Sequence, residues 1–306
     1  EGEVLVELNP DRPFTPASTL KVVTGLAAME VLGADYHFET RFHVDDQGWL
    51  YVEGRGDPFL VSEELDLLAP ALIAADSREF AGLILDDSYY ERGIRIPGVS
   101  GSDKPYDALN SALAVNFNTI FVKISGDQVT SAEEQTPLVP LAIEAAKESG
   151  RKGEARINLA KDPDRALLYA GEVIRAKLVA HGATVGEEIR TGSVPTGSEP
   201  FYVHTNTRPV SEVVAGMLYY SNNYTANQLL MEMGVSRAGP PASLDKGVAV
   251  VREVLVGHGL ADEITYVEGS GISRNNQATA SAMIRLLEPF APHKELLRDR
   301  RGSMAK

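Results

Sequence analysis

The sequence contains no cysteine among its 306 residues. Disulfide frameworks and thiolate metal sites are therefore excluded, whereas the compartment stays open because an exported protein need not contain cysteine. The six histidines are scattered, without His-x-x-x-His or Glu-x-x-His spacing. We accordingly expect no structural or catalytic metal and no cofactor.

Long apolar runs and clustered positive charge are missing as well. No stretch approaches the roughly 20 apolar residues that span a bilayer, so we expect no transmembrane segment, and the sequence as given shows no signal peptide. A formal net charge of -14 argues against nucleic acid as a partner, since phosphate binding requires clustered Lys and Arg. With 43% hydrophobic residues, the chain can bury a substantial core and has room for more than one domain.

A serine and a lysine stand three positions apart near the start of the chain. Residues 18–21 read Ser-Thr-Leu-Lys, with Pro16 just before them and an apolar run after them that ends at Gly33. This pattern predicts a buried helix that carries Ser18 and Lys21 on one face. An amine beside a hydroxyl is a base beside a latent nucleophile. Burial would lower the pKa of the lysine; the alternative is that Lys21 extends its amine to solvent.

A second polar cluster, residues 221–223 (Ser-Asn-Asn), lies between two predicted helices. One helix is expected over 210–220 and the other directly after the cluster. Serine and asparagine usually mark helix caps and turns, which is one interpretation of the triplet. In the other interpretation, Ser221 supplies a second hydroxyl and Asn223 an amide able to orient a substrate.

The order of these motifs resembles that of the class C low-molecular-mass penicillin-binding proteins. The resemblance covers nearly the whole chain and rests on residues 16–21 (Pro-Ala-Ser-Thr-Leu-Lys), 54–60 (Gly-Arg-Gly-Asp-Pro-Phe-Leu), 221–223 and 269–275 (Gly-Ser-Gly-Ile-Ser-Arg-Asn). Four motifs in register are far more specific than one, and Ser-x-x-Lys is part of the signature of these proteins. The resemblance implies an α/β (α+β) fold of the penicillin-binding-protein and serine β-lactamase-like transpeptidase type, with an antiparallel sheet and a helical cluster.

The sequence departs from the family pattern at two places. Asn222 replaces the common aspartate, a mild change because the family's roles fall on the outer two positions of the triplet. The third motif, Lys-Thr-Gly, should follow, but the sequence given stops at Lys306. The resemblance therefore implies that Lys306 begins this motif and that the C-terminal strands are missing. Residues 190–192 (Arg-Thr-Gly) precede the triplet and run into a Gly/Pro/Ser-rich stretch, so we interpret them as a surface loop.

The chain is predicted to consist of one domain interrupted by another. Residues 1–40 and 205–306 would form a discontinuous catalytic domain, with a strand at 4–8 and helices at 244–260 and 279–290. Residues 41–204 would form an inserted α/β region with room for two nested subdomains, because about 160 residues are too many for a loop. Its strand candidates are 42–44, 49–52, 83–85 and 120–124, and its helix candidate is 164–183.

The function that the resemblance implies is that of a serine-type D-alanyl-D-alanine carboxypeptidase or endopeptidase. Such an enzyme attacks peptidoglycan stem peptides through an acyl-enzyme, here on Ser18, and is inhibited by β-lactams. Lys21 would take the proton from Ser18, and Ser221 would relay a proton to the departing amine. The catalytic residues that the resemblance implies are thus Ser18, Lys21, Ser221, Asn223 and Lys306, and substrate binding would fall to Asn223, Lys306 and Ser270. The protein would act outside the cytoplasm, on the periplasmic or cell-wall side.

Two other functions are compatible with the same fold. One is a non-catalytic wall-binding or scaffold protein, although such a binder would be free to lose Ser18, Lys21, Ser221 and Asn223, which are all present. The other is a β-lactamase, which the large insertion between the first two motifs disfavours. The choice between carboxypeptidase and endopeptidase, the role of the inserted region and the oligomeric state stay open.

Residues 1–306 alone should be nearly inactive compared with a chain extended past Lys306. In the family, one oxyanion donor comes from the strand after Lys-Thr-Gly, and the loss of one such donor costs about 10²–10³ in rate. Release of D-alanine by the two chains measures the difference, and equal activity would contradict this expectation.

Overall fold

The chain divides into two compact units, each described by itself. The computed structural model describes residues 4, 6–76, 79–159 and 162–297. Unit 1 comprises residues 1–35, 95–99 and 210–306, and unit 2 comprises residues 36–94 and 100–209. The predicted domain boundaries near 40 and 205 lie a few residues inside unit 2. No sequence pattern indicates the short return of 95–99 to unit 1.

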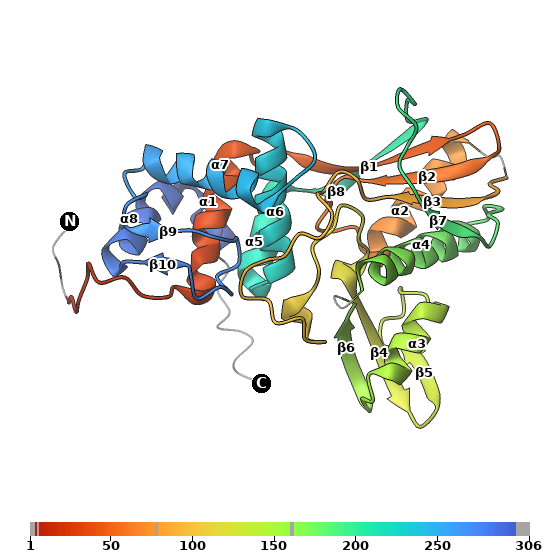
Figure 1. Ribbon diagram of the computed structural model, residues 1–306, viewed down its shortest axis with the longest axis horizontal. Helices are drawn as coiled ribbons and strands as arrows, with labels where there is room; N and C mark the ends of the chain where they lie inside the picture. Colours follow the sequence, from red (N-terminus) through yellow and green to blue (C-terminus); the bar gives the residue numbers. More distant parts are fainter. Residues whose placement is uncertain (1–3, 5, 77–78, 160–161, 298–306) are drawn as a thin grey trace. The chain divides into compact units, whose positions relative to one another are not determined.

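Unit 1 is a cluster of helices around a central one, α1 (Lys21–Val31) (Figure 1). Its side chains are buried almost all round, which is typical of a helix that is apolar on most faces. Gly33 ends it with a φ of 90°, a conformation that glycine adopts without strain, as predicted. The helices that pack against α1 are α5 (Val210–Tyr220), α6 (Asn223–Ala238), α7 (Leu244–Gly257) and α8 (Ala280–Phe290). They confirm the helices predicted from the sequence.

Strands are few in the described part of unit 1. Its sheet is a two-stranded antiparallel ribbon of β9 (Ile264–Thr265) and β10 (Gln277–Ala278), and Phe14 forms a β-bridge with Ala278. The strand predicted at 4–8 is wrong for its described residues, which are not in a strand. The side chains of Val6 and Leu8 are 91% and 83% exposed. An apolar alternation makes a strand only where a neighbouring strand pairs with its backbone.

Unit 2 is built on a mixed five-stranded sheet (Figure 1). Along the sheet the order is β7 (Ile189–Thr191), β3 (Gly82–Asp86), β2 (Trp49–Gly54), β1 (His37–Val44) and β8 (Tyr202–Pro209). The strand pairs β7–β3 and β3–β2 are parallel, and the pairs β2–β1 and β1–β8 are antiparallel. The strands predicted around 42–44, 49–52 and 83–85 are thereby confirmed.

Two helices, α2 (Ser62–Ala75) and α4 (Pro163–Ala180), pack against each other and against this sheet. The buried residues of α2 include Leu65, Leu68 and Leu72, at the i, i+3, i+7 spacing of one helix face. They join the buried residues of β3 and α4 in one apolar core. This core is what makes the inserted region a folded unit rather than a long loop.

The loop predicted at 190–192 is wrong for its first two residues, which belong to edge strand β7. Arg190 and Thr191 pair with Ile84 and Leu85 of β3. The Arg190 guanidinium lies over the Trp49 ring, 3.9 Å from its centroid, and also bonds Glu188. A three-residue strand has too little apolar pattern to be distinguished from a turn by sequence alone.

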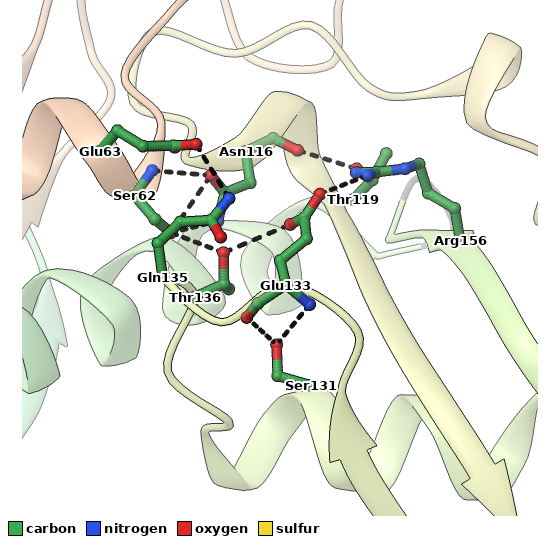
Figure 2. A network of polar contacts seen from close by, with 9 residues as sticks. All are labelled: Ser62, Glu63, Asn116, Thr119, Ser131, Glu133, Gln135, Thr136 and Arg156. Atoms are coloured by element: carbon green, nitrogen blue, oxygen red, sulfur yellow. Dashed lines mark hydrogen bonds and ion pairs between the residues drawn. The ribbon is translucent and has the colours of Figure 1, made fainter.

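A smaller antiparallel sheet of unit 2 has the order β5 (Gln128–Ser131), β4 (Thr119–Ser125), β6 (Gly153–Asn158), with α3 (Pro140–Glu148) beside it. Polar contacts connect this sheet to the start of α2 (Figure 2). Ser62 donates from its backbone N–H to Asn116, and its hydroxyl contacts Thr136. Thr136 in turn donates to Glu133, which also pairs with Arg156 of β6. Buried polar groups are thus satisfied where the two sheets join.

The crossing of α6 and α7 depends on two glycines, Gly234 and Gly247. A Cβ at Gly234 would lie 2.7 Å from the backbone nitrogen of Gly247. A Cβ at Gly247 would overlap the carbonyl oxygen of Leu230. The two backbones therefore come closer together than side chains would allow.

Gly247→Ala should lower the free energy of unfolding by about 1–3 kcal/mol, because the methyl group forces the helices apart. Gly257→Ala is the matched control at the end of the same helix, where a Cβ would meet nothing within 4 Å. This control should stay within about 1 kcal/mol of the wild type. Urea denaturation followed by circular dichroism compares them, and equal stability of the two variants would refute the close packing.

Candidate active site

Ser18 and Lys21 are brought together by a tight turn at the start of α1. Ser18 lies in the 3-10 turn η1 (Ala17–Leu20), which leads directly into α1 at Lys21. Side chains three residues apart eclipse each other in a 3-10 turn, which aligns the two groups. Ser18 is exposed, whereas Lys21 is only 1% exposed. The hydroxyl thus faces the surface and the amine lies beneath it.

Three oxygen atoms surround the amine of Lys21. Its Nζ lies 2.7 Å from Oδ1 of Asn223 and 2.7 Å from the carbonyl oxygen of Ser270. It lies 3.4 Å from Oγ of Ser18. The interpretation in which Lys21 extends to solvent is therefore wrong, because α5, α6, α7 and α8 enclose the helix that carries it.

The three contacts are chemically unequal. The amide and carbonyl oxygens of Asn223 and Ser270 can only accept hydrogen bonds, whereas the hydroxyl of Ser18 can also donate. A neutral amine has two N–H groups and one lone pair. If the two short contacts use both N–H groups, the lone pair is left for the Ser18 hydroxyl. This geometry suits removal of the serine proton.

The charge state of Lys21 favours the same chemistry. Burial lowers its pKa from 10.5 to about 8, and the negative charge of Glu268 opposes this decrease. Desolvation disfavours the ammonium form because the positive charge loses its hydration. A useful fraction of Lys21 is therefore uncharged near neutral pH.

The triplet 221–223 combines a helix end and a helix start. Ser221 follows α5 with a φ of 54° and is exposed, and the backbone N–H of Asn222 donates to Met217. A non-glycine residue in this left-handed conformation is strained, and such residues cluster at functional sites. Asn222 caps α6 by accepting from the N–H of Thr225 at 3.1 Å. The capping interpretation thus holds for Asn222, while Asn223 contacts Lys21.

Ser270 contributes its backbone rather than its side chain to the contact with Lys21. The residue is fully buried, and its hydroxyl donates to Glu268 at 2.7 Å. The neighbouring Gly269 carbonyl accepts from the Thr24 hydroxyl at 2.6 Å, which ties the loop to α1. A substrate contact by Ser270 stays a prediction. Lys306 lies outside the described residues.

Two site residues were not identified from the sequence, Glu268 and Asn227. Glu268 accepts hydrogen bonds from the loop that follows it, and Asn227 accepts from the N–H of Gly269 at 2.7 Å. The sequence feature that could have identified Asn227 is its spacing, since it lies four residues after Asn223 on the same face of α6. The feature that could have identified Glu268 is its place directly before a Gly-Ser-Gly turn, where an acidic side chain can accept from the backbone N–H groups of the turn.

The glycine-rich motif 54–60 lies in unit 2 and makes contacts within it. Asp57 is buried and accepts from Asn206 and from the backbone of Phe59, both at 2.8 Å. Burial raises the pKa of Asp57 to about 6. Beside it, the buried Glu64 bonds His204 at 2.9 Å. The motif therefore fastens β2 to β8 in addition to turning the backbone.

The described residues contain no cluster of three or more His, Asp or Glu side chains arranged to hold a metal ion. Within the same residues, every helix is too short or too polar to cross a membrane.

Known proteins resemble this chain in sequence and in structure. A D-alanyl-D-alanine carboxypeptidase of Actinomadura sp. is 30% identical over 94% of this chain, which spans 62% of the relative's length. The crystal structure of penicillin-binding protein 4 from Haemophilus influenzae matches with a TM-score of 0.74 at 22% identity, over 96% of this chain and 74% of that one. Its complex with a β-lactam matches with a TM-score of 0.69 at 21% identity, over 96% and 72%.

The structural likeness shows a penicillin-binding fold, as the sequence motifs predicted. The family comparison covers almost all of the chain. Residues 1–165 and 151–299 match the D-Ala-D-Ala carboxypeptidase 3 (S13) family, and the chain belongs to this family.

Proposed function

We propose that the protein is a serine-type D-alanyl-D-alanine carboxypeptidase that acts on peptidoglycan stem peptides. The observation that carries the proposal is the arrangement of the Lys21 amine, held by two acceptors at 2.7 Å with Ser18 Oγ as its third neighbour. In this arrangement a buried base faces an exposed hydroxyl. Covalent catalysis by serine requires this combination.

The proposed reaction starts with attack by Ser18 Oγ on the carbonyl carbon of the penultimate D-alanine. The hydroxyl proton passes to the lone pair of Lys21 as the new C–O bond forms. The tetrahedral intermediate then collapses, the C–N bond to the terminal D-alanine breaks, and the departing nitrogen takes a proton relayed by Ser221. Water finally hydrolyses the acyl-enzyme and restores the Ser18 hydroxyl.

Substrate binding is proposed for residues on several segments. Asn223, at the start of α6, would hold the amide of the substrate. Lys306 would keep the site electropositive and bind the terminal carboxylate. Because the chain is acidic overall, with a net charge of -14, attraction of the peptide has to be local.

The relatives support this substrate and this location. The Actinomadura relative is named a D-alanyl-D-alanine carboxypeptidase, and the Haemophilus influenzae protein is a penicillin-binding protein solved with a β-lactam. We infer that β-lactams acylate Ser18 of this chain and that it acts outside the cytoplasm, where peptidoglycan lies.

Ser18→Ala should abolish covalent labelling of the full-length natural protein by a fluorescent penicillin, because the hydroxyl that forms the ester is gone. Thr19→Ala is the matched control, since it removes the neighbouring exposed hydroxyl, and it should still be labelled. Gel fluorescence and intact mass measure the adduct. An unlabelled wild type would support a non-catalytic scaffold, and a labelled Ser18→Ala protein would place the nucleophile elsewhere.

The acylation rate should depend on pH through Lys21. Only the uncharged amine accepts the proton, and its pKa is about 8. The second-order rate constant for acylation should therefore fall about tenfold per pH unit below 8 and level off above it. Stopped-flow acylation with benzylpenicillin between pH 5.5 and about 9.5 gives the profile.

Lys21→Arg should reduce this rate constant by about 10²–10⁴, because the guanidinium stays protonated. Lys246→Arg on α7 is the control and should keep both the rate and the profile. A wild-type rate that is flat from pH 6 to 9 would argue against Lys21 as the base.

A further inference from the structure

Glu268 is a fully buried carboxylate next to the proposed site. Its Oε2 accepts from the backbone N–H and the hydroxyl of Ser270, both at 2.7 Å, and from Asn227 at 3.4 Å. Its Oε1 accepts from the N–H of Gly271 at 2.7 Å, the N–H of Ser273 at 3.3 Å and Nδ2 of Asn276 at 2.6 Å. A buried charge is costly unless it is hydrogen-bonded, and these six donors compensate for that cost.

These bonds fold the loop 268–276 around the carboxylate. Every donor except Asn227 belongs to the loop itself, so the conformation of the loop depends on Glu268. Gly98, in the segment that returns to unit 1, lies close against the backbone of Ser273. The loop is therefore held by the Glu268 carboxylate and also packed against the backbone at Gly98.

The loop makes two contacts with the nucleophile segment. The first is the Ser270 carbonyl, which lies 2.7 Å from Nζ of Lys21. The second is Gly271, whose φ of 81° is suited to glycine and whose missing side chain leaves space for the carbonyl of Ala17. Ala17 immediately precedes Ser18. Through the loop, the Glu268 carboxylate thus supports the amine of Lys21 and the backbone just before Ser18.

Among the described residues, Glu268 is the charged group that shifts the pKa of Lys21, and its negative charge raises it. Tyr266 lies on the other side of Thr24, and burial raises the pKa of its hydroxyl, so it is neutral. The α6 groups that face the loop, Asn223 and Asn227, are neutral amides. The arginines of the adjoining segments, Arg95 and Arg274, are both exposed to solvent.

We propose that Glu268 is a positioning residue for the reaction: its carboxylate fixes the Ser270 carbonyl and the Gly271 turn against Lys21 and Ser18, and its negative charge balances the ammonium form of Lys21. This role rests on the proposed function. Two opposing effects then act on the base, since burial favours the uncharged amine and Glu268 favours the charged one. The ammonium formed after proton transfer is stabilised where it arises.

The test compares Glu268→Gln with Glu268→Asp and with Glu253→Gln, an exposed carboxylate on α7. Benzylpenicillin acylation of the full-length natural protein is measured against pH. Glu268→Gln removes the charge, so the midpoint of the profile should move down by about one pH unit. Its plateau at high pH should fall at least about tenfold, because the amide NH₂ replaces an acceptor.

The charge-preserving Glu268→Asp should keep the wild-type midpoint and lose plateau rate, because the shorter side chain holds the loop less well. Glu253→Gln should reproduce the wild-type profile in both respects. A purely structural role for Glu268 predicts a lower plateau with an unmoved midpoint in Glu268→Gln. That result, or a profile that superimposes on the wild type, would overturn the proposal.

Ser270→Ala keeps the proposal testable if Glu268→Gln does not fold. It removes one of the donors to Glu268 and the acceptor of the Ile272 N–H, but leaves the carboxylate and the Ser270 carbonyl in place. The plateau should fall severalfold while the midpoint does not move down, and an unchanged rate would contradict the role of the loop. If penicillin does not acylate the wild type, the proposed function itself is refuted. If the wild type is acylated and substitution of Glu268 leaves its pH profile unchanged, only this inference is refuted.

Discussion

The amine of Lys21 is held by two oxygen atoms that can only accept hydrogen bonds, and the rest of the site depends on this constraint. The acceptors come from Asn223 and Ser270, which are 202 and 249 positions away in the sequence. The helices of unit 1 bring these segments to α1 and exclude water from the amine. The exposed Ser18 is then the neighbour that can give up a proton.

The nucleophile and its base could be predicted from the sequence because their relation is local. A spacing of three residues in a helical turn places Ser18 over Lys21 whatever the rest of the fold does. The motif 269–275 marks the loop, but local spacing could not show that the Ser270 carbonyl binds Lys21, since every residue has a carbonyl and the contact depends on the fold. Glu268 was missed for a related reason. Its importance comes from five donors of the folded loop and a sixth from Asn227 on α6, which only the folded chain brings to it.

The fold was predictable where a periodic pattern was long. The helices of unit 1 and the first strands of unit 2 follow from spacing and from glycine or proline at their ends. The strand expected at 4–8 is wrong because pairing, not alternation, decides whether a segment is a strand. Edge strand β7 was missed because its parallel partner β3 lies far away in the sequence. The return of 95–99 to unit 1 has no local signal at all.

The most direct test of the account is the titration of Lys21 itself, followed by NMR with ¹³Cε-labelled lysine in the absence of any inhibitor. We expect one lysine signal to titrate with a pKa of about 8 and to be missing from the spectrum of Lys21→Arg. If every lysine titrates near the ordinary value of about 10.4, the buried amine is not the base that the structure indicates.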